Sequence, residues 1–323
     1  MAIVKKKVSH RFAVAMLVFT CALWGTSFSS VKLCGAMIVG SSLPGTSAAF
    51  GPVLLTALRF TLAVPLLFLF CSSNRTWRPK RSDLPPLLRV ALPMTVGFLT
   101  QAAGLAFTTA TISGFITGLC VCVTPAFEWL LLSKRPTWRL VAGALLAIVG
   151  VALMTLTQGG SGSFGWGEVL TLICTFAFTL QIIYTGRSSE KLGAPRLTLG
   201  SFVMVALCGW IAALVMSPDS VTAAIRGVAV SPRFWLFFVV ILLGATIGAS
   251  VLMNTFQRYI RPSEAAIVYV TEPLFASAFA VLFIGQGELP SGWGWVGAGL
   301  MIVANLLVAM KSEERLPQNP AGA

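Results

Sequence analysis

Charged side chains are scarce in this sequence: Asp, Glu, Lys and Arg are 10% of its 323 residues, whereas a soluble globular chain carries about 25%. Too few charges are present to cover a soluble surface, and the same scarcity excludes a disordered chain or a coiled coil. Hydrophobic residues make up 56%. The composition therefore predicts a polytopic membrane protein, in which ten helices of about 20 residues use roughly 200 positions.

Patterns for catalysis and nucleotide binding are also lacking. The single histidine, His10, lies in a basic N-terminal segment where we expect solvent. The sequence contains no His-x-x-x-His, no Asp pair, no Gly-x-Ser-x-Gly and no Walker motif. We therefore predict a chain that is not an enzyme and that needs no metal and no cofactor.

The cysteines number seven, an odd count, and most lie inside apolar runs: Cys21, Cys120, Cys122, Cys174 and Cys208. A buried cysteine behaves as a small hydrophobic residue. The Cys-x-Cys at 120–122 has no histidine or second cysteine pair near it in the sequence, so it does not predict a zinc site.

Ten apolar runs are long enough to span a bilayer, at about 11–33, 52–71, 87–107, 111–133, 138–157, 165–186, 197–216, 234–257, 264–284 and 293–310. The first follows three lysines and resembles a signal peptide. The rest of the chain is too apolar for an exported soluble protein, so we interpret this run as a first span. We expect 34–51 to be an irregular outer loop and 311–323 to be a disordered cytoplasmic tail.

The formal net charge of +13 would suggest nucleic acid in a soluble protein. Placing the N-terminus inside puts 19 of the 23 Lys and Arg residues on the inner side, and only Arg226 and Arg233 on the outer side. Lys32 and Arg59 fall within spans. This asymmetry follows the positive-inside rule. It predicts ten spans with both termini cytoplasmic and removes the nucleic-acid interpretation.

Two halves of five spans each would lie inverted in the membrane, as in many secondary transporters. Val-Thr-Pro-Ala-Phe at 123–127 matches Thr-Glu-Pro-Leu-Phe at 271–275, and each lies in the fourth helix of its half. The fold that we expect is all-α and integral to the membrane, with two inverted five-helix repeats at 11–157 and 165–310.

These motifs make the chain resemble the drug/metabolite transporter superfamily of EamA type. The resemblance covers about 11–310 and is carried by Trp24-Gly25-Thr26-Ser27-Phe28, Leu58-Arg59-Phe60, the stretch from Thr108 to Pro125, Pro262 to Pro273, and Gly285 to Glu288. It implies a central cavity and export of small metabolites such as amino acids. The sequence departs from the family pattern in its long 34–51 loop and in Ser133-Lys134-Arg135, where an acidic ending is common.

Glu272 is the strongest functional candidate, because charge inside a bilayer is costly. It lies about 12 Å into its predicted helix at 1.5 Å per residue. Pro273 follows it and frees a backbone carbonyl. A carboxyl group there is a candidate for cargo binding and for proton coupling. The alternative is a structural hydrogen bond to a neighbouring helix.

Four other charged residues have simpler explanations. Arg59, near mid-depth, offers a fork that matches a carboxylate, or it pairs with an acid or carbonyls and locks the bundle. We expect Lys32 to extend towards the outer interface, Glu168 to be solvated near that interface, and Glu128 to pair with Lys134 or Arg135.

Polar residues follow helical spacing on several predicted spans. Candidates for contact with cargo are Trp24, Ser27, Gln101, Ser113, Thr117, Thr124, Phe178, Gln181 and Tyr269, together with Glu272. The same small polar faces can instead make hydrogen bonds between helices. Most other tryptophans lie near span ends, where interface anchoring explains them.

The leading hypothesis is a secondary transporter in the plasma membrane that carries a small metabolite by alternating access. Amino acids or their derivatives are the expected cargo, and the resemblance is the basis for that expectation. The alternatives are another metabolite class, such as a nucleobase, S-adenosylmethionine or a drug-like compound, or a membrane-embedded enzyme.

Overall fold

A computed structural model describes residues 9–70, 80–120, 122–124, 126–127, 138–157, 165–256, 268–269, 271–290 and 292–309. In these ranges all regular structure is helical. The expected tail at 311–323 and the pairing of Glu128 with Lys134 or Arg135 fall outside them.

The longer helices are α1 (His10–Gly40), α2 (Phe50–Phe70), α4 (Leu84–Gly104), α7 (Trp138–Thr157), α8 (Trp166–Leu192), α9 (Ala194–Met216) and α15 (Trp293–Ala309). Shorter ones are α5 (Ala110–Gly118), α10 (Pro218–Ala229), α11 (Pro232–Val239), α12 (Ala249–Phe256) and α14 (Glu272–Phe283). A π-helical segment, η2 (Val240–Gly248), joins α11 to α12, and two 3-10 turns are η1 (Arg81–Asp83) and η4 (Gln286–Glu288).

Local chemistry explains where several helices begin. The hydroxyl groups of Ser9, Thr109 and Ser231 accept hydrogen bonds from backbone amides in the first turns of α1, α5 and α11, which satisfies donors that a helix start leaves free. Proline stands in the first turn of α4, α9, α10 and α11, where it removes an amide that has no helical partner.

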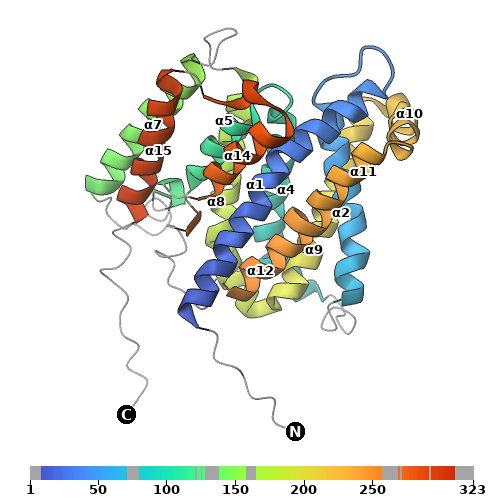
Figure 1. Ribbon diagram of the computed structural model, residues 1–323. Helices are drawn as coiled ribbons and strands as arrows, with labels where there is room; N and C mark the ends of the chain where they lie inside the picture. The colour runs from blue at the N-terminus through green and yellow to red at the C-terminus, as the bar shows by residue number, and fades with distance from the viewer. Residues whose placement is uncertain are drawn as a thin grey trace, which may run out of the picture.

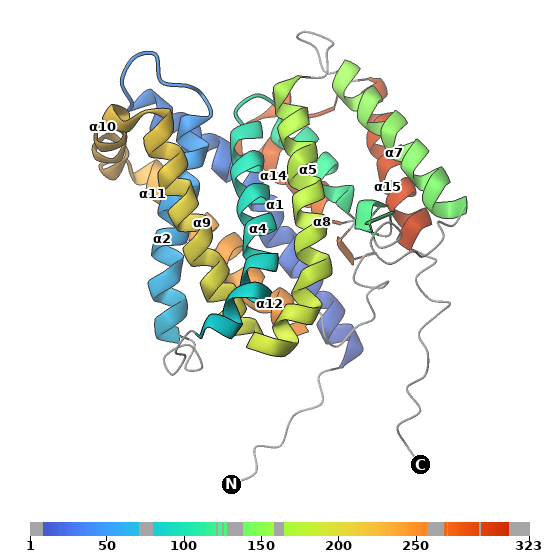
Figure 2. The same cartoon turned by 180° about the vertical axis from the view of Figure 1, so that it is seen from behind.

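Helices α1, α4, α5, α8 and α14 occupy the middle of the bundle in both views (Figures 1 and 2). The pair α7 and α15 flanks them on one side, and α2, α9, α10 and α11 lie on the other. Helix α1 begins at the lower end of the bundle in Figure 1. We call the opposite end, where α5 begins, the distal end.

Large apolar side chains cover the outside of the bundle. Val215 is 80% exposed, Leu282 is 72% exposed and Leu207 is 60% exposed. Exposed apolar surface on this scale is costly in water and favourable in lipid. Within the described residues, six helices are long and apolar enough to cross a membrane, and four shorter apolar helices coincide with four other predicted spans.

Two expectations from the sequence are wrong. Helix α1 continues to Gly40, so the irregular outer segment begins seven residues later than expected. The stretch 217–233, expected to be a loop, contains α10. The helix predicted at 234–257 is found as one continuous helical run through α11, η2 and α12, and its middle has π geometry.

Candidate functional site

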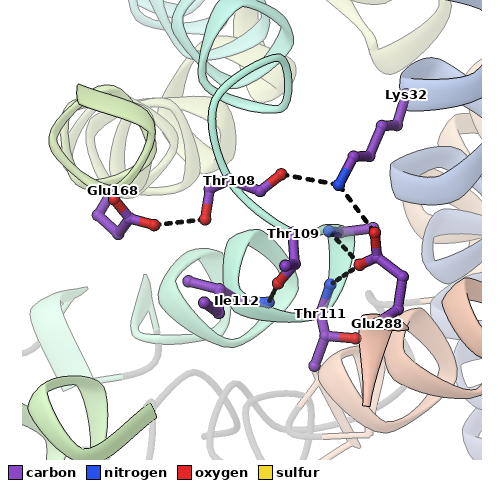
Figure 3. Close-up of polar contacts among 8 residues, drawn as sticks. Lys32, Thr108, Thr109, Thr111, Ile112, Glu168 and Glu288 are labelled. Carbon is purple, nitrogen blue, oxygen red and sulfur yellow. Dashed lines mark hydrogen bonds and ion pairs between the residues drawn. The ribbon is translucent and has the colours of Figure 1, made fainter. Parts of the chain in front are cut away.

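A buried polar cluster closes the distal end of the bundle (Figure 3). Lys32 Nζ lies 2.8 Å from Glu288 Oε1 and donates a 3.0 Å hydrogen bond to the backbone carbonyl of Thr108. The Thr108 hydroxyl bonds in turn to Glu168 Oε1. We call Lys32, Thr108, Glu168 and Glu288 the distal network.

Glu288 also caps helix α5. Its Oε2 accepts a 2.7 Å hydrogen bond from the amide of Ala110 and a longer one, 3.5 Å, from Thr111. A carboxylate there meets both free amides and the positive end of the helix dipole. Gly285, at φ 128°, turns the chain from α14 into η4, and this turn places the buried Glu288 side chain at the start of α5.

The distal network corrects two expectations. Lys32 does not simply extend towards the interface, because its ammonium group is held by Glu288 and by a carbonyl oxygen. Glu168 is 7% exposed rather than solvated, and it also accepts a hydrogen bond from the amide of Gly165. Two charges that each look like interface residues in the sequence are therefore parts of one buried cluster.

Glu272 lies among the central helices. Its carboxyl group lies near Cys21 of α1, Cys174 of α8 and Tyr269. It is only partly buried, and it makes no hydrogen bond or ion pair with any residue that the structure describes. The structural hydrogen bond considered as an alternative is thus not found within these limits.

An aromatic pair borders this position. Trp24 of α1 and Tyr269 have ring centroids 5.9 Å apart, and both rings are partly exposed. Helix α1 approaches α14 closely because Gly25 faces the backbone of α14 at Phe275 and Ala276. The central acid and the indole therefore come from two helices in direct contact, and the phenol comes from the segment just before α14.

Several polar candidates make hydrogen bonds between helices. Gln101 Nε2 donates to Thr117 Oγ1 at 3.3 Å, and Ser113 lies 3.4 Å from the Thr171 hydroxyl. Gln101, Ser113 and Thr117 are each at most 9% exposed. These contacts join α5 to α4 and α8, which is the alternative that the sequence left open.

The remaining candidates are partly exposed. Ser27 and Thr124 donate to carbonyl oxygens of their own helices, and Gln181 follows Phe178 on the inner face of α8. Phe178 packs on Phe98 with ring centroids 5.1 Å apart. These side chains, with Trp24, Tyr269 and Glu272, are the polar and aromatic groups that keep accessible surface among the candidates.

Arg59 is 4% exposed in the middle of α2, and its guanidinium carbon lies 4.9 Å from the ring centroids of both Phe60 and Phe98. It pairs with no acid among the described residues, and its Nε is buried without an acceptor. The expected ion pair that would lock the bundle is therefore not found in the described part of the chain.

Glu288 and Thr108 were missed as site residues by sequence reasoning, although both lie in the motifs that carry the family resemblance. The sequence offered one indication of the pair that Glu288 forms with Lys32, namely two opposite charges on the same side of the predicted bundle. Lys32 is a cation inside a predicted span near its outer end, and Glu288 is an acid in a short segment predicted on the same side.

Comparison with known proteins shows the family. The sequence profile of the EamA-like transporter family matches residues 11–156 and again 165–310. A relative from Archaeoglobus fulgidus, named as an uncharacterized transporter, is 25% identical over 94% of this chain and 88% of its own length. A solved crystal structure matches with a TM-score of 0.58 at 18% identity, covering 94% of this chain and 98% of that one.

A second relative carries a more specific name. A protein of Streptantibioticus cattleyicolor, named as a probable terminal-alkyne amino-acid exporter, is 25% identical over 92% of this chain and 93% of its own length.

Proposed function

The chain belongs to the EamA-like transporter family, and from this premise we propose that it is a secondary transporter that exports a small metabolite by alternating access. The family implies a small-molecule substrate and a membrane location. We place the protein in the plasma membrane with both termini cytoplasmic, and we propose ten spans in two inverted repeats, 11–157 and 165–310.

One observation carries the proposal: Glu272 is a partly accessible acid among the central helices, and it pairs with none of the residues that the structure describes. Charge at such a position is expensive unless it serves a pathway or a ligand. The two regions that match the family meet there, since Cys21 belongs to the first and Tyr269 and Glu272 belong to the second. A site between repeats is where carriers of this architecture bind cargo.

The distal network supports an alternating cycle. Lys32 belongs to the first matched region and Glu288 to the second, and their ion pair holds the regions together at one end. If the two regions rock against each other, the ion pair breaks when the distal end opens. The structure then corresponds to a state closed at that end.

We propose amino acids or their derivatives as cargo. The exporter from Streptantibioticus cattleyicolor, similar over nearly the whole length of both chains, supports this class. We also propose that Glu272 exchanges a proton during the cycle, because it has no fixed cationic partner among the described residues.

Counterflow in proteoliposomes tests the proposal. Liposomes preloaded with a pool of amino acids, including one with a terminal alkyne, are given a labelled trace of each compound. Saturable uptake stimulated by the internal pool supports a carrier. Absence of counterflow for the whole pool, with folded protein, contradicts the cargo class.

The variant Glu272→Gln tests coupling in the same vesicles at two pH values. We expect it to retain exchange and to lose accumulation driven by a pH gradient. The matched control is Asp219→Asn, which removes an exposed acid at the start of α10 and leaves both activities unchanged. A Glu272→Gln protein that keeps gradient-driven accumulation contradicts proton coupling at this residue.

A further inference from the structure

Arg59 carries a charge that no described side chain neutralises. It is the tenth residue of the 21-residue helix α2, and it is 4% exposed. No carboxylate among the described residues pairs with it, since Glu168 and Glu288 are bound within the distal network. A buried polar group without a partner requires an explanation in water-soluble and membrane proteins alike.

The surroundings of the guanidinium group leave its hydrogen-bonding edge open. The Phe60 and Phe98 ring centroids are each 4.9 Å from the guanidinium carbon and 4.9 Å from one another. Aromatic rings stabilise the cation through their faces, but they accept none of its N–H groups. Because Nε has no acceptor among the described residues, the arrangement matches a site that is completed by an oxygen ligand from outside.

We propose that Arg59 binds the carboxylate group of the cargo, with Phe98 and Phe178 contacting an apolar part of the same molecule. This inference rests on the proposed transport function. It names the feature that selects cargo: one carboxylate attached to an apolar body.

Charge balance favours a carboxylate over a phosphate. A carboxylate matches the planar fork of one arginine with two parallel hydrogen bonds, and one negative charge neutralises one positive charge. A phosphate dianion would need a second cation. Lys32, a second described cation well inside a predicted span, is already paired with Glu288.

The aromatic contacts connect Arg59 to the centre of the bundle. Phe98 bridges the guanidinium group and Phe178, whose ring centroid is 5.1 Å from its own. Phe98 and Phe178 are both partly exposed, whereas Phe60 is fully buried. Phe178 lies one turn from Cys174 on α8, and Cys174 lies near Glu272. The apolar surface of the proposed site therefore leads towards the acid of the transport proposal.

The test compares acids with their amides on the purified full-length protein. Thermal stabilisation in detergent is measured with leucine and phenylalanine, with leucinamide and phenylalaninamide, and with sodium chloride at equal ionic strength. We expect the free carboxylates to stabilise the protein at concentrations about 10–100-fold lower than the amides, the ratio expected for a charge-assisted pair of hydrogen bonds. Equal stabilisation by chloride, or by acid and amide, overturns the inference.

Three variants separate Arg59 from a structural role. Arg59→Gln is expected to abolish the preference for acid over amide. Arg59→Lys keeps the charge, loses the fork and is expected to reduce the preference several-fold. Phe98→Leu is expected to weaken binding of both forms equally and to keep the ratio. If Arg59→Gln does not fold, the other two variants still test the inference, because Arg59→Lys should reduce the preference for acid over amide and Phe98→Leu should keep it. An unchanged preference in Arg59→Lys contradicts a bidentate site.

Counterflow distinguishes this inference from the transport proposal. If leucine or phenylalanine and their amides are exchanged equally well and saturably, the transport proposal stands and the proposal that Arg59 selects a carboxylate is contradicted. If no compound of the amino-acid pool is exchanged, the proposal that amino acids are the cargo is contradicted. In that case stabilisation by a carboxylate, lost in Arg59→Gln, would still support the anion site on its own.

Discussion

Lys32 Nζ and Glu288 Oε1 lie 2.8 Å apart although 256 positions separate these residues in the sequence. The two side chains differ in burial, at 29% exposed for Lys32 and 5% for Glu288. Their bond connects α1 with the segment after α14, and the second oxygen of Glu288 connects that segment with α5. One carboxylate therefore holds three segments at the distal end.

The first prediction compares the two partners of this pair. Glu288→Gln is expected to lower the free energy of unfolding by about 1–3 kcal/mol, because a partly buried ammonium group and a helix N-terminus both lose their anion. Lys32→Met is expected to cost less, since the amide of Ala110 still bonds to Glu288. Thermal denaturation in detergent measures both effects, and a larger loss for Lys32→Met contradicts the capping role.

Opening of the distal end is the second prediction. Glu288→Gln removes the ion pair between the two matched regions and is expected to increase labelling of a cysteine placed at Thr111, which is now fully buried beneath the network. Native cysteines are first replaced by alanine in both backgrounds. Equal labelling with and without the ion pair would show that another contact keeps this end closed.

The third prediction concerns Glu168. Its carboxylate accepts hydrogen bonds from Thr108 and from the Gly165 amide, so Glu168→Gln, which turns one acceptor into a donor, is expected to destabilise the protein by about 1–2 kcal/mol. Asp219→Asn, at an exposed acid, is expected to stay within about 0.5 kcal/mol of the parent. Similar melting temperatures for both variants would show that the hydrogen bonds of Glu168 add no measurable stability.

The sequence was sufficient for the class of fold, because apolar length and the near absence of charge leave few alternatives. It misplaced the end of α1 because Gly35 and Gly40 resemble loop residues. In the structure Gly35 lies against Pro52 of α2, a close helix–helix approach that a side chain would prevent. A glycine in a membrane helix can thus mark packing where the same residue in a soluble chain marks a break.

The site was only partly predictable for a related reason. Helical spacing identified the polar faces of 113–117 and 171–181, but it could not distinguish a hydrogen bond between helices from a contact with cargo. That distinction depends on which helix packs against the polar face. Gln101 of α4 donates a hydrogen bond to Thr117 of α5, a pairing that helical spacing alone does not reveal. Glu272 was found because a lone acid in an apolar run is conspicuous. Glu288 was not, because its partner is distant in sequence.

The fourth prediction tests the contact between α1 and α14 beside the central acid. A Cβ atom added at Gly25 would lie 2.7 Å from Phe275 Cβ and 2.9 Å from the backbone nitrogen of Ala276. Gly25→Ala is therefore expected to separate the helices, to cost about 1–3 kcal/mol and to reduce counterflow. Gly40→Ala, at the open end of the same helix, is expected to be neutral or to stabilise by up to about 1 kcal/mol. Comparable losses in both variants would mean that helix propensity, and not packing, governs α1.

The fifth prediction concerns the π segment between α11 and α12. Such segments are frequent at functional sites and hinges, and η2 packs against α1. In π geometry each amide approaches the carbonyl five residues earlier, and a Cβ added at Gly248 would lie 2.8 Å from the Leu243 carbonyl oxygen. Gly248→Ala is thus expected to force this turn out of π geometry.

The expected result is slower transport together with altered hydrogen exchange confined to 240–248. Gly244→Ala is the matched control, because its added Cβ would meet only Leu23 Cδ2, at an ordinary 3.5 Å, and its exchange and transport should match the parent. If both alanine variants transport at the parental rate while exchange changes only in Gly248→Ala, the π geometry is a packing feature. A loss of transport in Gly248→Ala alone identifies it as a hinge, since the two substitutions add the same methyl group one turn apart in the same segment.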